Sequence, residues 1–212
     1  YWEVRRNMKF ILASQNRHKL VEMQSILSAH GVEVVLQGDL GLHVEVEETG
    51  SSFAENAMLK AKAVMEASGL PAIADDSGVC VDALSGAPGI YSARYGGPEL
   101  DDVGRYQLLL SNMRGAANRA AHFTSAIACI FPNGDTIEAE GICPGTIAYA
   151  PQGDGGFGYD PVFFLPQLRK TYAQLTPEEK AAVSHRGKAL AVFEEKLKNY
   201  LSQKESGNGT DQ

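Results

Sequence analysis

Two adjacent carboxylates, Asp75 and Asp76, directly follow a short apolar run and precede a Ser77-Gly78 pair. The apolar run, together with the alternation that begins after Gly78, predicts a strand, a tight turn and a second strand. Neighbouring carboxylates repel, so a half-buried strand end tolerates them mainly when a cation, a donor or solvent compensates their charge. The pair therefore indicates a divalent-metal site, although Asp-Asp-Ser-Gly also suits an ordinary surface turn.

A second polar segment, residues 14–19, separates an apolar strand at 9–13 from a helix whose apolar residues recur from Leu20 onward. Backbone amides and the positive end of the helix dipole meet at such a position, and both suit a phosphate group. Lys19 could add a charge and Asn16 a donor. The alternative is a surface helix capped at its N-terminus that carries incidental basic residues.

An acidic segment that includes Glu47 and Glu48 leads into a helix predicted from Ser52 onward. Spacing of four residues places Asn56 and Lys60 on one side of that helix, where they either face a ligand or form a solvated surface. For Asn56 we do not favour the solvated alternative, because its amide interrupts an Ala-rich stretch.

A glycine-rich segment at 153–158 leads into the apolar residues that follow Pro161. Glycines let the backbone approach a ligand closely, and the flat rings of Phe157 and Tyr159 offer surfaces on which a base could stack. Asp160 supplies an acceptor whose position is restricted by the following proline. The alternative is a glycine-rich turn before a buried strand.

Near the C-terminus, Thr176 and Pro177 begin a predicted helix that is interrupted at residues 184–188. A final amphipathic helix is expected from about 188 to 201. His185 and Arg186 either form a solvated turn between the helices or recognise a purine carbonyl or a phosphate.

Other segments complete an expected mixed α/β fold. Strands are predicted at 32–36, 121–131, 136–143 and 145–150, with an Asn-Gly hairpin at 132–135, and a helix is predicted at about 101–113. We expect one domain over residues 8–201. Residues 1–7, which precede a candidate initiator methionine, and residues 202–212 are expected to lie outside it, the latter frayed.

Composition narrows the class of protein. The chain is 44% hydrophobic and 21% charged, with a formal net charge of −7, which argues against a nonspecific binder of duplex DNA. No apolar stretch approaches the roughly 18 residues of a membrane span, and no signal peptide is recognisable. The three cysteines lack metal-type spacing, so we expect them to be reduced and the compartment to be the cytosol.

Taken in order, these segments resemble the inosine/xanthosine triphosphate pyrophosphatase family over residues 8–201. The matching motifs are Ser14-x-Asn16-x-x-Lys19, Glu47-Glu48-Thr49-Gly50, Phe53-x-Glu55-Asn56-Ala57, Ala74-Asp75-Asp76-Ser77-Gly78, Pro88-Gly89-x-Tyr91-Ser92-Ala93-Arg94, Gly156-Phe157-Gly158-Tyr159-Asp160-Pro161 and Ser184-His185-Arg186-Gly187. One departure is Gln15, where the family commonly has glycine.

The resemblance implies a two-lobed α/β fold around a long central sheet, a nucleotide cleft and a homodimer. It also implies hydrolysis of ITP, dITP or XTP to the monophosphate and pyrophosphate, with Mg²⁺. Glu48 and Asp76 would organise the metal, and Asp76 would accept a proton from the attacking water. The residues that would hold the triphosphate are Ser14, Gln15, Asn16, Arg17, His18 and Lys19. The residues that would contact the rest of the nucleotide are Ser77, Phe157, Gly158, Tyr159, Asp160, Lys180, His185 and Arg186.

Three rival functions are weighed against this one. Maf-like nucleotide pyrophosphatases have a similar fold but prefer other bases. Hydrolysis rates with a panel of nucleotides distinguish them from the inosine/xanthosine triphosphate pyrophosphatases. A binding module without catalysis is disfavoured by the presence of both carboxylates and Lys19. A phosphatase would release orthophosphate, so identification of the product excludes or supports it.

Overall fold

A computed structural model of the chain describes residues 8–207 and divides them into two compact units. Within that range, unit 1 contains residues 8–76, 126–140 and 189–207, and unit 2 contains residues 77–125 and 141–188. The expectations for residues 1–7 and 208–212 lie outside the described residues. No helix in the described part of the chain is long and apolar enough to cross a membrane.

In the described part of the chain, seven strands form a mixed sheet in the order β2-β1-β3-β4-β5-β6-β7. The strands are β1 (Met8–Leu12), β2 (Val32–Leu36), β3 (Ala72–Val81), β4 (Ala120–Ile130), β5 (Thr136–Ile147), β6 (Phe163–Leu165) and β7 (Lys170–Thr171). β1 pairs in parallel with β2 and β3, whereas β6 pairs antiparallel with β5 and β7. The expected mixed α/β fold is confirmed.

Five α-helices accompany these strands within residues 8–207. They are α1 (Arg17–Leu27), α2 (Phe53–Ser68), α3 (Asp102–Asn112), α4 (Pro177–Val183) and α5 (His185–Gly207). Short 3-10 helices connect the elements: η1 (Ser28–His30), η2 (Gln37–Leu40), η3 (Asp82–Leu84), η4 (Gly89–Arg94), η5 (Asp160–Val162) and η6 (Tyr172–Gln174).

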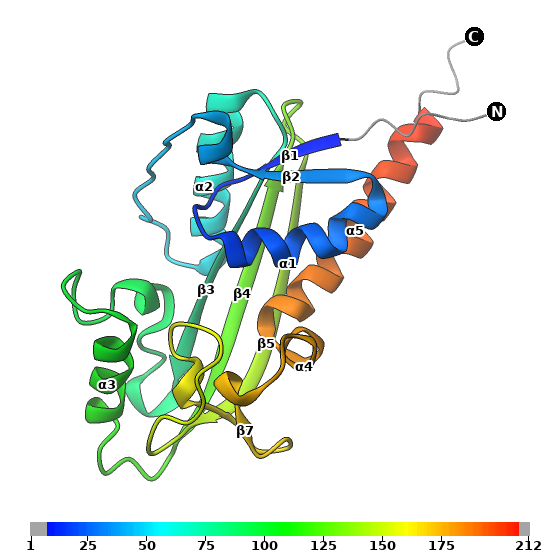
Figure 1. The fold of residues 1–212 in the computed structure, drawn as a ribbon. Coiled ribbons are helices and arrows are strands. Elements are labelled where there is room, and N and C mark those ends of the chain that lie inside the picture. The colour runs from blue at the N-terminus through cyan, green and yellow to red at the C-terminus, as the bar shows by residue number, and fades with distance from the viewer. Residues whose placement is uncertain (1–7, 208–212) are drawn as a thin grey trace. The chain divides into compact units, whose positions relative to one another are not determined.

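Helices cover both faces of the sheet within unit 1 (Figure 1). Successive residues of a strand point to opposite faces, and β1 shows this directly. Phe10 and Leu12 pack in one apolar cluster with Met23 of α1 and Phe193 of α5. Ile11, which lies between them in sequence, packs in another cluster with residues of α2. Thus α1 and α5 cover one face, and α2 covers the other.

Unit 2 has an apolar core of its own. Val79 and Val81 of β3, Leu109 of α3 and Phe163 of β6 belong to one buried cluster. Aromatic rings fill much of this core, with the ring centroids of Phe123 and Phe163 4.7 Å apart in an edge-on arrangement. This core fixes the segments that carry the C-terminal candidate residues.

The region around Asp75 and Asp76 differs from the sequence prediction. β3 runs without a break from Ala72 to Val81, so Ser77-Gly78 lies inside a strand and makes no turn. The local turn signal of Ser-Gly is overridden by pairing with neighbouring strands. The separate strand predicted at 145–150 is instead a continuation of β5, which ends at Ile147.

The end of the chain also differs from the prediction. α5 begins at His185 and reaches Gly207, so the expected break at 184–188 is reduced to Ser184 and the helix passes the predicted end at Leu201. Gly187 explains the short junction, since a Cβ there would lie 1.9 Å from the carbonyl oxygen of Ala181. Ser184 caps the new helix by accepting from the amide of Gly187 at 3.0 Å.

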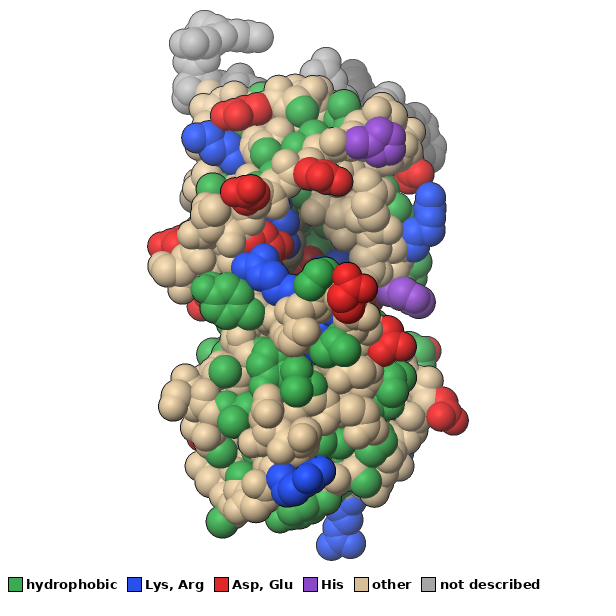
Figure 2. Space-filling view, turned by 90° about the vertical axis from the view of Figure 1, so that its left-hand side faces the viewer, with side chains coloured by type: hydrophobic (Ala, Val, Ile, Leu, Met, Phe, Trp, Pro, Cys, Tyr) green, Lys and Arg blue, Asp and Glu red, His purple; other side chains and the backbone are tan. Residues whose placement is uncertain are grey.

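Acidic and basic side chains are interspersed on the face drawn in Figure 2, and that face has no single broad basic area. This distribution agrees with the negative formal net charge. It gives the phosphate backbone of duplex DNA no extended positive surface on this face.

Candidate functional site

Asp75 and Asp76 point to opposite faces of β3, and each meets a lysine from the helix that covers its own face. Lys19 of α1 places its Nζ atom 2.8 Å from Oδ1 of Asp75, whose side chain is only 1% exposed. Lys60 of α2 places its Nζ atom 3.6 Å from Oδ1 of Asp76. The adjacent carboxylates are therefore compensated separately, because strand geometry divides them between two helices.

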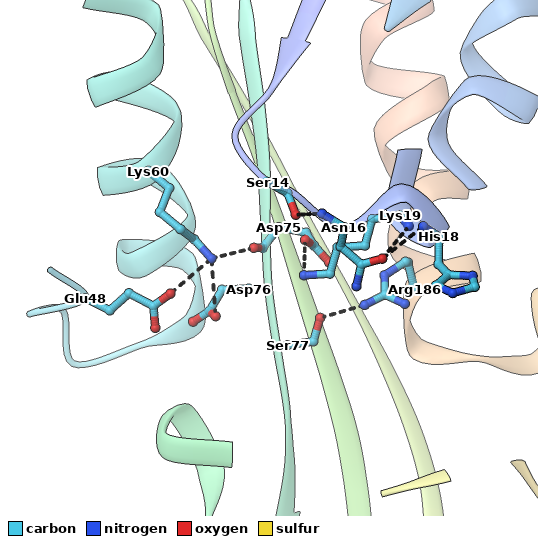
Figure 3. Close-up of polar contacts among 10 residues, drawn as sticks. All are labelled: Ser14, Asn16, His18, Lys19, Glu48, Lys60, Asp75, Asp76, Ser77 and Arg186. Atoms are coloured by element: carbon cyan, nitrogen blue, oxygen red, sulfur yellow. Dashed lines mark hydrogen bonds and ion pairs between the residues drawn. The ribbon is translucent and has the colours of Figure 1, made fainter. Parts of the chain in front are cut away.

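Lys60 connects three parts of unit 1 (Figure 3). Its Nζ atom lies 3.2 Å from Oε1 of Glu48 and donates a hydrogen bond of 2.8 Å to the backbone carbonyl of Asp75. Together with its approach to Asp76, these contacts gather Glu48 and Asp76 around one ammonium group. The sequence indicated a metal site for Asp75 and Asp76 together, whereas the structure pairs Asp75 with Lys19. Lys60, which the sequence offered as a residue that faces a ligand or solvent, lies against Glu48 and Asp76.

The surroundings of Asp76 shift the pKa of its carboxyl group. Burial raises the pKa of Asp76 from 3.8 to about 6, while Lys60 acts in the opposite direction and Glu48 adds to the increase. A carboxylate with a pKa near neutrality is a better proton acceptor than an ordinary aspartate. The geometry thus gives Asp76 properties that a general base requires.

Glu48 and Asp76 also suit a hard divalent cation. Oδ2 of Asp76 is buried and has no hydrogen-bond partner among the described residues, so it remains available as a ligand. No group of three or more His, Cys, Asp or Glu side chains in residues 8–207 forms a metal cluster. Mg²⁺ commonly takes one or two carboxylates and completes its shell with water and substrate phosphates, which fits this pair.

The segment after β1 forms the start of α1, as the sequence indicates. Asn16 is its N-cap, and its Oδ1 accepts from the amides of His18 at 2.9 Å and Lys19 at 3.3 Å. Oγ of Ser14 accepts from the amide of Asn16 at 3.0 Å. The cap occupies two amides that we expected to face a phosphate, so Lys19 is the principal charge that this segment offers.

Two further predicted residues of this segment lie on the surface. Arg17 pairs with Asp39 at 3.1 Å in an exposed contact. Gln15 is exposed, and its side chain lies against Gly38, where a Cβ would come within 2.9 Å of the Gln15 Oε1 atom. The glutamine that departs from the family pattern is therefore accommodated by a neighbouring glycine.

Unit 2 gathers most of the C-terminal candidates around Phe157. The Nζ atom of Lys180 lies 4.9 Å above the Phe157 ring, and the guanidinium carbon of Arg186 lies 5.7 Å above it. Lys180 also pairs with Oδ2 of Asp160 at 2.7 Å. Phe157 is 37% exposed, so its ring remains accessible beside two cationic groups.

Asp160 holds the glycine-rich segment in place. Its Oδ2 accepts from the amide of Phe157 at 3.0 Å, in addition to the pair with Lys180. Burial raises the pKa of Asp160, and Lys180 opposes that increase. The Oδ2 atom of Asp160 thus contacts two groups of the protein itself.

The ring of Tyr159 is not a stacking surface. It is buried in the core of unit 2, and its hydroxyl donates to the carbonyl oxygen of Ser92 at 2.6 Å. Next to it, the Gly158 amide donates to Asp102 at 2.9 Å. The expectation that both aromatic rings of this segment offer open faces therefore holds for Phe157 alone.

His185 and Arg186 form the first turn of α5 and are buried. The His185 ring stacks on Phe123, with centroids 4.6 Å apart, and its Nδ1 lies 3.4 Å from the hydroxyl of Tyr172. Arg186 is 4% exposed and donates to Oγ of Ser77 at 3.3 Å (Figure 3). A rigid imidazole and guanidinium of this kind can recognise carbonyl or phosphate oxygens.

The chain matches known proteins over nearly its whole length. The model of the Ham1 family matches residues 10–196. A dITP/XTP pyrophosphatase of Exiguobacterium sp. is 47% identical over 190 residues, which cover 90% of this chain and 97% of that protein. A dITP/XTP pyrophosphatase of Streptomyces coelicolor is 50% identical over 189 residues, covering 87% and 94%.

Solved structures agree with the sequence matches. The Ham1 protein of Staphylococcus aureus has a TM-score of 0.84 and 39% identity, with 91% of this chain and 99% of that chain covered. A nucleoside-triphosphatase described as a dITP/XTP pyrophosphatase, from Mycobacterium abscessus, has a TM-score of 0.73 and 46% identity, covering 87% and 97%.

Proposed function

Because the chain belongs to the Ham1 family, we propose that it hydrolyses nucleoside triphosphates with an abnormal purine base, such as ITP, dITP and XTP, to the monophosphate and pyrophosphate. The observation that carries the proposal is the cluster of Glu48, Lys60 and Asp76, in which two carboxylates meet one lysine. Such a cluster can position a metal ion and activate water beside a phosphoanhydride.

In this proposal, Glu48 and Asp76 hold Mg²⁺, which when bound neutralises phosphate charge and orients the phosphate oxygens. Residues 14–19 hold the triphosphate, with Lys19 as the nearest side-chain cation. Lys60 neutralises the two carboxylates of the site when no metal is present. Its position beside both acids supports a second task, which is to balance negative charge on the phosphates.

Asp76 accepts the proton of the water that attacks the α-phosphorus. Its pKa, raised to about 6 by burial, supports this assignment because the ionised form then predominates at neutral pH while remaining basic. Attack at the α-phosphorus breaks the bond to the bridging oxygen, and pyrophosphate leaves with the electron pair of that bond.

Unit 2 supplies the groups that recognise the base and sugar. Phe157 offers a stacking face, and Lys180 and Arg186 stand beside it. A donor such as Arg186 or His185 favours the carbonyl at position 6 of hypoxanthine or xanthine over the amino group of adenine. Four further residues contribute to this recognition through their backbone or through contacts that hold the cluster together. They are Ser77, Gly158, Tyr159 and Asp160.

The proposal also covers the setting of the enzyme. We propose a homodimer and a cytoplasmic location, as we expected from the sequence. The three cysteines form no disulfide bond, which is compatible with a reducing compartment. Size-exclusion chromatography with light scattering tests the dimer.

The function is tested by phosphorus NMR of the products formed from ITP with Mg²⁺. IMP and pyrophosphate in equal amounts support the proposal, whereas orthophosphate and IDP contradict it. A panel of ITP, XTP, dITP, GTP, UTP and dUTP at matched concentrations then tests base preference. Preference for UTP or dUTP would indicate the Maf-like alternative.

A further inference from the structure

The side chain of Asn56 lies at the junction between α2 and the acidic segment that carries Glu48. Asn56 is 0% exposed. Its Oδ1 accepts a hydrogen bond of 2.8 Å from the backbone amide of Gly50. Gly50 is two residues from Glu48, so this bond attaches the acidic segment to the helix that also supplies Lys60.

The hydrogen bond to Gly50 also determines which way the Asn56 amide points. A backbone N–H can only donate, so the oxygen of the Asn56 amide must face Gly50 and its nitrogen must face away. That nitrogen is buried on the side of the amide that points away from Gly50. The oxygen of this side chain is therefore committed to the segment that carries Glu48.

The fit between Gly50 and Asn56 is close. A Cβ at position 50 would lie 2.6 Å from Oδ1 of Asn56 and 2.7 Å from Cβ of Glu55. Real Cβ atoms essentially never approach neighbours at these distances. The backbone of the acidic segment can reach the Asn56 amide only because residue 50 has no side chain.

Asn56 is not needed to start α2. Ser52 accepts from the amide of Glu55 at 3.1 Å, and Glu55 accepts from the amide of Ser51 at 2.7 Å. Meanwhile Nδ2 of Asn56 is buried without a hydrogen-bond partner among the described residues. A buried donor without a partner reduces stability, so a role confined to packing would favour an apolar residue at this position.

We propose that Asn56 is a positioning residue that fixes residues 47–50 against α2 and so holds the Glu48 carboxylate beside Asp76 in the geometry that a divalent cation requires. The inference rests on the proposed function in one respect, namely that Glu48 and Asp76 are the metal ligands. It adds a residue that orients a ligand without binding the metal itself.

The test compares three variants by NMR, with Mn²⁺ alone as the metal probe. Asn56→Ala removes the acceptor, and Gly50→Ala disturbs the same contact from the segment side without opening a cavity in the core. Val64→Ala is the matched control, because Val64 is a buried residue of α2 that packs in the adjoining apolar cluster. Each variant is assayed for exchange of the backbone amide of residue 50, for Mn²⁺-induced broadening of the Glu48 resonance, and for the Mg²⁺ dependence of ITP hydrolysis.

In Asn56→Ala and Gly50→Ala we expect the backbone amide of residue 50 to exchange about tenfold faster or more. We also expect the half-saturating concentrations of Mn²⁺ and of Mg²⁺ to rise about tenfold. Amides in the middle of α2 should keep their protection. Val64→Ala should lower thermal stability and leave both metal concentrations within about twofold of wild type. A role that was only structural would make Asn56→Ala resemble Val64→Ala.

The inference is overturned if folded Asn56→Ala and Gly50→Ala keep the wild-type metal dependence, whether or not the backbone amide of residue 50 exchanges faster. If Asn56→Ala does not fold, Gly50→Ala decides the question by the same readouts. Failure of the proposed function is recognised separately, as absence of ITP hydrolysis by the wild-type protein. In that event the Mn²⁺ titration still supports or refutes the role of Asn56.

Discussion

At the scale of single residues, the site depends on how each carboxylate is compensated. Asp75 pairs with Lys19 on one face of β3, while Asp76 meets Lys60 and Glu48 on the other. Asp75 is thereby occupied by a structural ion pair. Asp76 retains a buried oxygen without a hydrogen-bond partner among residues 8–207, and it is the acid that we expect to act on water.

Asp76→Asn should reduce pyrophosphate release by at least about 100-fold, because the amide cannot accept the proton of water. Nucleotide affinity, measured by calorimetry with a non-hydrolysable ITP analogue, should remain within roughly threefold, since the phosphates are held mainly by other groups. Glu66→Gln, an exposed substitution on α2, is the control. Full activity of Asp76→Asn would refute the assignment of Asp76.

The same substitution should stabilise the metal-free protein above pH 6. The folded pKa of Asp76, about 6, exceeds the unfolded value of 3.8, so ionisation of this group disfavours folding. Its stabilising contribution is complete below pH 3.8 and is lost as the pH rises through 6. Allowing for partial access of solvent, we expect Asp76→Asn to gain about 1 to 2 kcal/mol at pH 7.5.

That gain corresponds to an increase of roughly 2 to 6 °C in the melting temperature, measured by calorimetry in buffer with a metal chelator. The difference between the two proteins should vanish near pH 4, where wild-type Asp76 is protonated. A melting temperature for Asp76→Asn that is lower than wild type at pH 7.5 would contradict the raised pKa.

At the scale of elements, the glycine-rich segment before η5 depends on close backbone contacts. Gly156 has a φ of +69°, and a Cβ there would lie 2.0 Å from Oδ2 of Asp160. That oxygen pairs with Lys180 and accepts from the amide of Phe157. The glycine-rich segment and Lys180, which we propose as a base-recognition residue, are therefore joined through the Asp160 carboxylate.

Gly156→Ala should raise KM for ITP about tenfold or more with a smaller effect on kcat, because displacement of Asp160 moves Phe157 and Lys180. Gly134→Ala is the matched control, since Gly134 also has a positive φ, of +91°, but no neighbour within 4 Å of the added Cβ. Steady-state kinetics with both variants makes the comparison. An equal rise of KM in both would show that backbone strain alone is responsible.

Local patterns in the sequence predicted most elements. β2 coincides with its predicted range, and the Asn-Gly hairpin and the helix starts predicted at Ser52 and at Thr176 are confirmed. These features depend on residues a few positions apart. The turn predicted at Ser77-Gly78 was wrong, and the break before α5 is shorter than predicted. Strand pairing and the close packing of Gly187 involve distant residues or contacts that local propensity does not record.

The sequence predicted only part of the candidate site. Residue types and order identified Glu48, Asp76 and Lys19 as groups suited to metal and phosphate. The pairing of Lys19 with Asp75, and the position of Lys60 between Glu48 and Asp76, depend on which face of β3 each side chain occupies. That face is set by the strand's path through Ser77, where the sequence predicted a turn.

At the scale of the whole molecule, the two compact units carry different parts of the proposed chemistry. Unit 1 contains the carboxylates and lysines suited to metal and triphosphate, and unit 2 contains Phe157, Lys180 and Arg186. The triphosphate is common to all nucleotides, so unit 1 cannot distinguish one base from another. Discrimination among bases should belong to unit 2.

Substitutions in the two units should therefore affect different parameters. Arg186→Ala should reduce the preference for ITP over ATP by about tenfold or more, because a donor to the carbonyl is lost, and should leave the Mg²⁺ dependence unchanged. Glu48→Gln should raise the half-saturating Mg²⁺ concentration and leave base preference unchanged. Competition assays at several Mg²⁺ concentrations measure both. If each variant altered both parameters equally, the division of tasks would be wrong.

The central claim is that water attacks the α-phosphorus of an abnormal purine nucleotide, so that pyrophosphate leaves intact. Hydrolysis of ITP in ¹⁸O-enriched water, followed by mass spectrometry of the products, tests it most directly. We predict one ¹⁸O atom in the phosphate of IMP and unlabelled pyrophosphate. Label in pyrophosphate, or release of IDP with labelled orthophosphate, would contradict the claim.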